Sequence, residues 1–133
     1  LNYASPFYDR QFITRKAVNN DVLSKLEQLF DNYFNDEKSL TNGLPSVNSV
    51  AEALNITLRY LSDLLRNLIG LNTQQFIHEK VIEKAKEYLA KDELNIAQIA
   101  YNLGFEHPQS FTKLFKKKTN LTPLQFKELI FKN

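Results

Sequence analysis

Two stretches of the sequence carry polar side chains at matching positions, and those side chains have the chemistry of base recognition. The residues are Arg59, Ser62 and Asp63 in the first stretch and Gln109, Thr112 and Lys113 in the second, at a constant offset of 50. Glutamine can form paired hydrogen bonds with adenine, arginine or lysine with guanine, and a hydroxyl with several base edges. We therefore predict that these six residues read bases in the major groove of DNA.

Basic side chains close to both stretches suit phosphate groups. Residues 108–133 hold six lysines and one acidic residue, a formal charge of +5, whereas residues 1–43 have a formal charge of −1. Positive charge gathered at one end of a chain favours a polyanionic partner, although a solvated basic face has the same composition. Phosphate contacts fix the register of a protein on DNA without reading its sequence. We predict such contacts for Arg66, Lys116, Lys117 and Lys118.

Asp63 differs in charge from its counterpart in the second stretch, Lys113. A carboxylate facing DNA is repelled by phosphates, although it can accept a hydrogen bond from cytosine. The acids Glu52 and Asp63 also balance Arg59 and Arg66, so the first stretch is formally neutral. We therefore expect the second stretch to supply more of the electrostatic affinity and the first to add selectivity or weak binding.

The polar positions belong to an internal repeat. The first copy holds V-A-x-x-L-N-I at residues 50–56, and the second holds I-A-x-x-L-G-F at residues 99–105. Two further matches pair residues 61–66 with 111–116 and residues 71–76 with 121–126. One residue inserted after Phe105 accounts for a change of offset from 49 to 50. A repeat of this kind indicates a duplicated supersecondary unit.

Each copy meets the physical requirements of a helix-turn-helix. Ser46 and Asn95 are suitable N-caps for the first helix of their copies. The turn needs one residue with positive φ, which Gly104 adopts freely and Asn55 tolerates. The second helix of each copy is then expected to bury Leu61, Leu64, Leu65 and Leu68, or Phe111, Leu114 and Phe115. The polar residues described above therefore face outward from the second helix.

Further helices are expected around the two copies. Apolar residues at helical spacing predict a helix over residues 21–35 with Asp21 as its N-cap, followed by a break at residues 41–43. A helix over residues 73–91 joins the copies, and a rise of about 1.5 Å per residue makes it about 28 Å long. That length is close to one turn of DNA, about 34 Å. The last helix should begin at Pro123.

The expected fold class is all-α, with two helix-turn-helix subdomains joined by a long linker helix and about seven helices in total. Residues 1–20 contain irregularly spaced aromatic residues and are interpreted as a linker or the tail of a missing N-terminal domain. Residues 21–133 form one domain. It divides into a first helix-turn-helix over 44–70, the linker helix over 72–91 and a second helix-turn-helix over 95–127.

The paired repeat resembles the DNA-binding domain of the AraC/XylS family. The closest stretch is residues 95–127, which read NIAQIAYNLGFEHPQSFTKLFKKKTNLTPLQFK. It is similar to the family signature in its I-A-x-x-L-G-F turn, its F-x-x-x-F-K-K helix and its T-P-x-x-F ending. The resemblance continues upstream to residue 44, so it covers about two thirds of the chain.

The resemblance implies a homeodomain-like fold of seven helices, with one recognition helix per subdomain in successive segments of the major groove. It implies double-stranded DNA and RNA polymerase as partners, and a bacterial, cytoplasmic transcription regulator such as an activator. Family members often carry a basic residue where this chain has Asp63, and an acidic cap is common where His107 stands. Many members have an N-terminal sensory or dimerisation domain, and the absence of methionine favours an excised fragment here.

Other classes of function find little support in the sequence. Hydrophobic content is 43% and charged content 24%, and no apolar run reaches the roughly 20 residues of a membrane span. The chain has no cysteine and two histidines, so we expect no metal site and no cofactor. Nothing supplies a catalytic group, and we predict no enzyme activity. The remaining alternative is a helical protein-interaction module with no specific DNA site.

Overall fold

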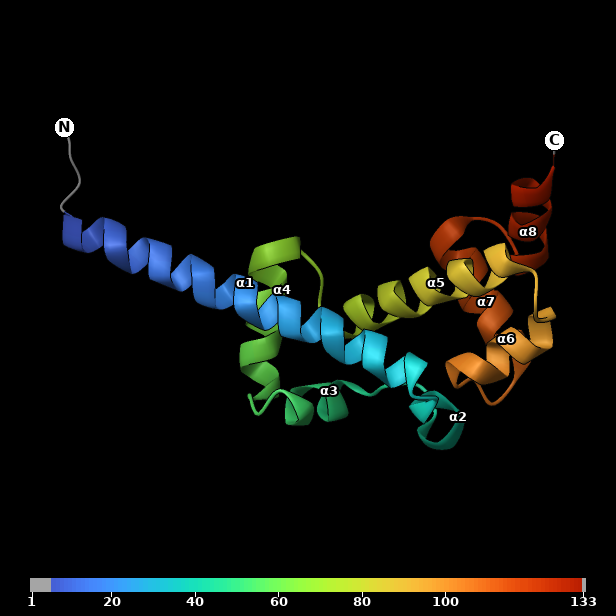
Figure 1. Cartoon of the computed structure of the whole chain (residues 1–133), viewed down its shortest axis with the longest axis horizontal. Helices are drawn as coiled ribbons and strands as arrows, with labels where there is room; N and C mark the ends of the chain where they lie inside the picture. Colours follow the sequence, from blue (N-terminus) through green and yellow to red (C-terminus); the bar gives the residue numbers. More distant parts are fainter. Residues whose placement is uncertain (1–5, 133) are drawn as a thin grey trace.

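The computed structural model describes the backbone of residues 6–132 and the side chains of residues 21–132. This part of the chain is all-α, as predicted, and contains eight helices and no strand (Figure 1). In chain order the helices are α1 (Pro6–Asn35), α2 (Lys38–Asn42), α3 (Val47–Ala53), α4 (Leu58–Ile69), α5 (Thr73–Lys91), α6 (Ile96–Leu103), α7 (Pro108–Thr119) and α8 (Pro123–Phe131). Within residues 6–132, no helix combines the length and the apolar character that crossing a membrane requires.

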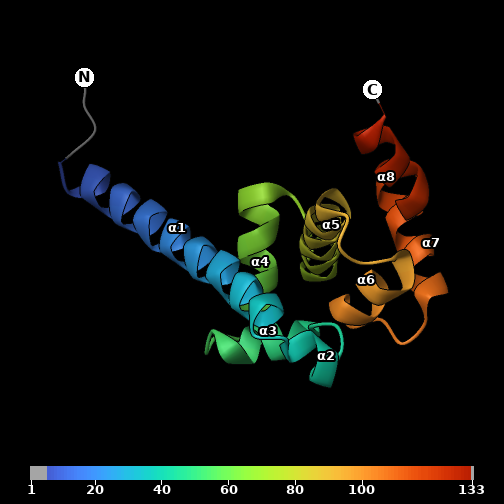
Figure 2. The same cartoon turned by 45° about the vertical axis from the view of Figure 1, so that its right-hand side comes forward.

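Two helix-turn-helix units lie at opposite ends of α5. The first unit consists of α3 and α4, and the second unit consists of α6 and α7 (Figures 1 and 2). α5 spans the predicted residues, and its 19 residues correspond to a rod of about 28 Å. α8 packs on the second unit beside the end of α5. The predicted arrangement of two units on one linker helix is therefore confirmed.

The first helix begins well before the predicted position. α1 starts at Pro6, so Asp21 lies inside a helix of 30 residues and does not cap its N-terminus. After Pro6 this segment contains neither glycine nor proline, the two residues that most strongly interrupt a helix. The N-terminal part of α1 extends away from the other helices in both views (Figures 1 and 2). Of the predicted linker, residues 1–5 lie outside the described residues, and the backbone of residues 6–20 is helical.

A short helix that the sequence did not predict follows α1. α2 has five residues and is entered through Glu37, whose φ is 60°. It ends at Gly43, whose φ is 78°, so the predicted break at residues 41–43 falls at the end of this helix. The total is thus eight helices in residues 6–132, one more than the seven expected.

The helix termini are fixed by side-chain caps at the predicted places. Ser46 accepts a hydrogen bond from the backbone N–H of Ser49, and Asn95 accepts one from that of Gln98. In both pairs the third residue of the helix returns a side-chain bond to the cap, which completes a capping box. Gly70 ends α4 in the left-handed region, with φ of 73°. Such caps satisfy N–H and C=O groups that a short helix would otherwise leave unpaired.

A continuous apolar core runs from α1 through both units. Ring contacts connect its aromatic members, from Phe30 on α1 to Phe76 on α5 at 5.7 Å and from Phe111 to Phe115 within α7 at 5.8 Å. The predicted core residues Leu61, Leu64, Leu65, Phe111 and Phe115 are buried, whereas Leu68 and Leu114 are partly buried. Each second helix therefore turns its apolar stripe inward, as the sequence indicated.

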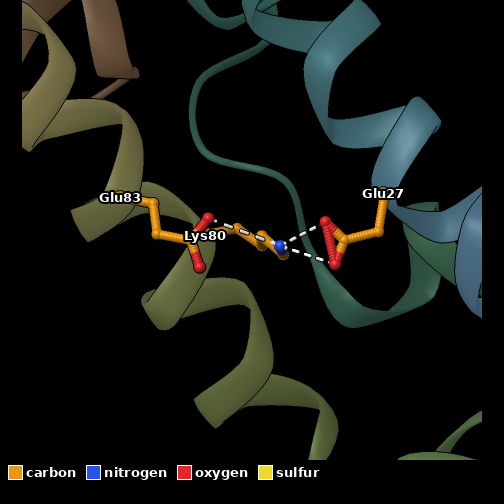
Figure 3. A network of polar contacts seen from close by, with 3 residues as sticks. All are labelled: Glu27, Lys80 and Glu83. Atoms are coloured by element: carbon orange, nitrogen blue, oxygen red, sulfur yellow. Dashed lines mark hydrogen bonds and ion pairs between the residues drawn. The ribbon is translucent and has the colours of Figure 1, made fainter.

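Charged contacts hold α1 along α5 (Figure 3). The Lys80 amino group on α5 donates to both carboxylate oxygens of Glu27 on α1, at 2.5 and 2.7 Å, and lies 3.4 Å from Glu83. Burial alone would lower the pKa of Lys80, but the hydrogen bond to Glu27 and the charges of Glu83 and Glu27 outweigh it and raise the pKa. Lys80 therefore stays protonated at neutral pH and continues to attach α1 to α5.

Candidate nucleic-acid interface

The turns of the two units share one backbone hydrogen-bond pattern. Asn55 has φ of 57° and Gly104 has φ of 105°, which confirms the predicted left-handed turn residue in each copy. In each unit the N–H of the next residue bonds to the carbonyl of the small helix residue, Ile56 to Ala51 at 3.1 Å and Phe105 to Ala100 at 3.0 Å. The same backbone closure therefore sets the angle between the helices in both copies.

The exposed face of α7 carries the polar residues predicted for the second unit. Phe111 and Phe115 are fully buried, and Gln109, Lys113 and Lys116 are exposed. Since residues three or four apart share a face of a helix, these three side chains form one ridge opposite the phenylalanines. Thr112 is half-buried at the edge of the ridge, and Lys117 is exposed next to it.

The start of α7 differs in chemistry from that of α4. Thr57 caps α4 by accepting a hydrogen bond from the backbone N–H of Tyr60 at 3.0 Å. His107 occupies the cap position of α7, as predicted, but its side chain makes no capping bond, and Pro108 follows in the first turn. A proline there needs no hydrogen-bond partner for its nitrogen. α7 thus begins with a proline in its first turn and has no side-chain cap.

The exposed face of α4 carries charges of both signs. Arg59, Asp63 and Arg66 are exposed on the side opposite Leu61 and Leu65. The Asp63 carboxylate lies 3.7 Å from the Arg66 guanidinium, one helical turn away. An exposed pair of this kind contributes little to stability, but its two charges offset each other at the surface. Arg59 and the exposed Glu52 of α3 complete the formally neutral first unit that composition predicts.

Ser62 is placed differently from the other predicted base-reading residues of α4. It is half-buried, and its hydroxyl lies 3.1 Å from the hydroxyl of Thr73, a buried residue at the start of α5. One of the two hydroxyls donates to the other, so Ser62 already has a partner inside the protein. Sequence reasoning gave Thr73 no role, and its position just after the Asn72 cap was the only signal that it lies at a helix junction.

The end of α7 packs back toward α5. Lys118 lies 3.9 Å from the Glu79 carboxylate, and its side chain is 22% exposed, whereas Lys116 and Lys117 are exposed. Burial, followed by the charges of Lys118 and Lys117, lowers the pKa of His78 on α5. His78 is therefore neutral at pH 7. Of the three consecutive lysines, two are exposed and the third lies near an acidic side chain of α5.

The fold and these two exposed faces define a DNA-binding domain with paired helix-turn-helix units. The family described as "Helix-turn-helix domain" matches residues 50–128, more than half of the chain. The chain belongs to the AraC-type helix-turn-helix family, as its sequence resemblance indicated. This membership does not favour the alternative of a helical interaction module without DNA.

Three relatives place the chain among longer proteins. It is 32% identical over 111 residues to an uncharacterized HTH-type transcriptional regulator of Pseudoalteromonas carrageenovora, covering 83% of this chain and 61% of that protein. It is 27% identical over 120 residues to the transcriptional activator RhaS of Salmonella newport, covering 90% and 41%. It is 27% identical over 114 residues to histidine kinase P4 of Formosa agariphila, covering 86% and 8%. The chain thus spans less than two thirds of the length of each relative.

Solved structures share the fold. The C-terminal domain of AraT, a response regulator from Geobacillus stearothermophilus, matches with a TM-score of 0.67 and 28% identity, covering 81% of this chain and 84% of that one. The DNA-binding domain of AdpA, solved in complex with a target DNA, matches with a TM-score of 0.63 and 17% identity, covering 84% and 90%. The second likeness concerns the fold alone.

Proposed function

We propose that this chain is the DNA-reading part of a sequence-specific transcription regulator. In this proposal α4 and α7 enter successive major-groove segments of a bipartite operator whose elements lie about 10 base pairs apart. The observation that carries the proposal is the repetition in both units of a left-handed turn residue, its closing hydrogen bond and an exposed polar face. The length of α5, about 28 Å, is compatible with units that follow one groove across a turn of DNA.

The residue roles follow from exposure and chemistry. Gln109 and Lys113 are assigned to bases in the second unit, with Thr112 at the edge of the same contact. In the first unit Arg59 and Asp63 are assigned to bases, and Ser62 has a smaller share because it must first leave Thr73. Phosphate contacts are assigned to Arg66, Lys116, Lys117 and Lys118, of which Lys118 is the weakest candidate because it faces Glu79.

We further propose that this domain belongs to a longer protein. We propose an upstream sensory or dimerisation domain and RNA polymerase as a partner, in the bacterial cytoplasm. The support is the greater length of the three relatives and the names of two of them, a transcriptional regulator and a transcriptional activator. No catalytic role is proposed for the domain itself.

Replacement of Gln109 or Lys113 by alanine is expected to relax base preference at one position of the selected site. Each loss should amount to about 1–3 kcal/mol of discrimination, because a paired side-chain contact to one base is removed. Selection of bound duplexes from a random pool, for the parent and each variant, measures this directly. If the parent enriches no motif at low or moderate salt, the proposal of sequence-specific control is wrong.

Replacement of Lys117 by alanine is expected to weaken binding to all duplexes alike. The slope of log affinity against log salt should become shallower by about 1, because one phosphate contact and its released counterion are lost. Titrations of one specific and one scrambled duplex at several salt concentrations measure the slope. Lys25→Ala is a control, since it removes the same charge from α1, where Lys25 pairs with Asp21 at 3.2 Å. Equal effects of both variants would contradict a local contact.

A further inference from the structure

One segment precedes the first unit in the sequence but packs on the second unit. Residues 38–44, here called the strap, consist of α2 with Gly43 and Leu44. The strap leaves the end of α1, contacts α6, and then returns to α3 of the first unit (Figures 1 and 2). It therefore forms a second connection between the units, beside the one that α5 provides.

Two hydrogen bonds fix the strap at its ends. The Ser39 hydroxyl donates to the carbonyl of Asn102, in the last turn of α6, at 2.5 Å, and Ser39 is 2% exposed. The Tyr33 hydroxyl on α1 donates to the carbonyl of Gly43 at 2.6 Å. Buried polar groups that lose such partners are costly, so both bonds hold the strap in one position. Glu27 and Lys80 attach α1 to α5, and the chain runs from Leu44 into α3, so the strap lies between the second unit, the linker helix and the first unit.

The turn of the second unit is in backbone contact with the strap. A Cβ atom added to Gly104 would lie 2.5 Å from the carbonyl carbon of Gly43 and 2.7 Å from the nitrogen of Leu44. At the equivalent turn of the first unit, Asn55 adopts a positive φ while carrying a side chain. Gly104 has a wider φ of 105°, which disfavours a side chain, and the close approach of the strap also leaves no room for one.

A second connection restricts how the two units can move relative to each other. A single helix leaves two attached bodies able to bend and twist about it, whereas two connections on different paths restrict both motions. On DNA, a change of one base pair between two elements moves the second element by about 3.4 Å along the axis and rotates it around the duplex. Whether the domain tolerates such a change depends on how firmly the units are held.

We propose that the strap sets the spacing and rotational phase of the two recognition helices, with Ser39 and Tyr33 as positioning residues that do not touch DNA. The proposal rests on the function proposed above. It assigns to these residues the discrimination between operators that differ only in the distance between their two elements. The strap thus contributes to specificity through geometry and not through contact with bases.

The test compares the parent with the double variant Ser39→Ala and Tyr33→Phe. Affinity is measured for the selected two-element duplex and for duplexes with one base pair inserted or removed between its elements. The parent should lose on the order of tenfold or more at each altered spacing, as it would for a mismatched element. The double variant should lose on the order of threefold or less, because its units can adjust to the altered spacing.

Ser49→Ala is the matched control. It removes a hydroxyl from the capping box of α3 and loosens the first unit, and within residues 21–132 the Ser49 side chain bonds to Ser46 of the same unit alone. It should lower stability and keep the spacing penalty of the parent. An unchanged penalty in the double variant, or a relaxed penalty in Ser49→Ala, overturns the proposal. If the double variant fails to fold, the spacing penalty is measured for Tyr33→Phe alone. An unchanged penalty in that variant then overturns the proposal. A parent without a two-element site would instead overturn the proposed function.

Discussion

Replacement of Gly104 by alanine is expected to destabilise the protein by about 3 kcal/mol, because two costs add at this position. The residue has φ of 105°, a region that side chains rarely adopt, and its new methyl group would lie 2.5 Å from the backbone of Gly43. The neighbouring atoms belong to the backbone, so relief requires the strap to move away from α6. Urea denaturation followed by helical circular dichroism measures the loss.

Gly70→Ala separates the two costs. Gly70 also has a positive φ, 73°, but a Cβ there would meet no atom within 4 Å. Its replacement should therefore cost only the conformational part, about 1 kcal/mol. The difference between the two variants reports the contact between the strap and the second turn. Equal losses would show that the strap does not press on Gly104 in solution.

Replacement of Phe111 by alanine is expected to cost about 3–5 kcal/mol, the usual effect of removing a buried aromatic ring. Phe111 is fully buried on α7, with the ring of Phe105 at 5.5 Å and that of Phe115 at 5.8 Å. The loss is a large fraction of the 5–15 kcal/mol that typically separates folded from unfolded domains. Thermal and urea unfolding of the parent and the variant measure it.

Leu129→Ala on α8 is the control for Phe111→Ala. Leu129 is 61% exposed, so its truncation should change the free energy of unfolding by less than about 0.5 kcal/mol. The Phe111 variant should also lose affinity for every DNA sequence, because α7, which carries Gln109 and Lys113, is no longer anchored by this ring in the core. A Phe111 variant as stable as the Leu129 variant would contradict the burial of this face of α7.

The sequence was sufficient to predict both helix-turn-helix units and the helix between them. Capping residues mark helix ends independently of tertiary contacts, and the predicted caps Ser46 and Asn95 are confirmed. The apolar stripes of α4 and α7 follow one helical period, so the exposed ridges opposite them could also be predicted. The assignment of individual side chains on these ridges to bases or phosphates stays a prediction.

The elements missed by sequence reasoning lack local signals. The aromatic residues before Asp21 do not follow one helical stripe, so the start of α1 at Pro6 could not be read from periodicity. α2 has only five residues, fewer than a helix needs to be stable alone, and depends on contacts such as the bond from Ser39 to Asn102. α2 is therefore determined by a neighbour far away in the sequence.

In the candidate interface, too, some features follow from local sequence patterns and others depend on distant contacts. That Gln109 and Lys113 are exposed follows from the helical period of α7 alone. That Ser62 contacts Thr73 and that Lys118 faces Glu79 depends on how α5 packs against each unit. No pattern within α4 or α7 contains this information, because it arises only when the linker helix is in place.

The path of the strap also bears on how the chain reaches its folded state. Ser39 and Asn102 bond across a separation of 63 residues, so during synthesis the strap is made long before its binding surface on α6 exists. The strap can therefore complete its packing only after α6 has been synthesised. We therefore expect the two units, although duplicates of one motif, to depend on each other for stability and to unfold together.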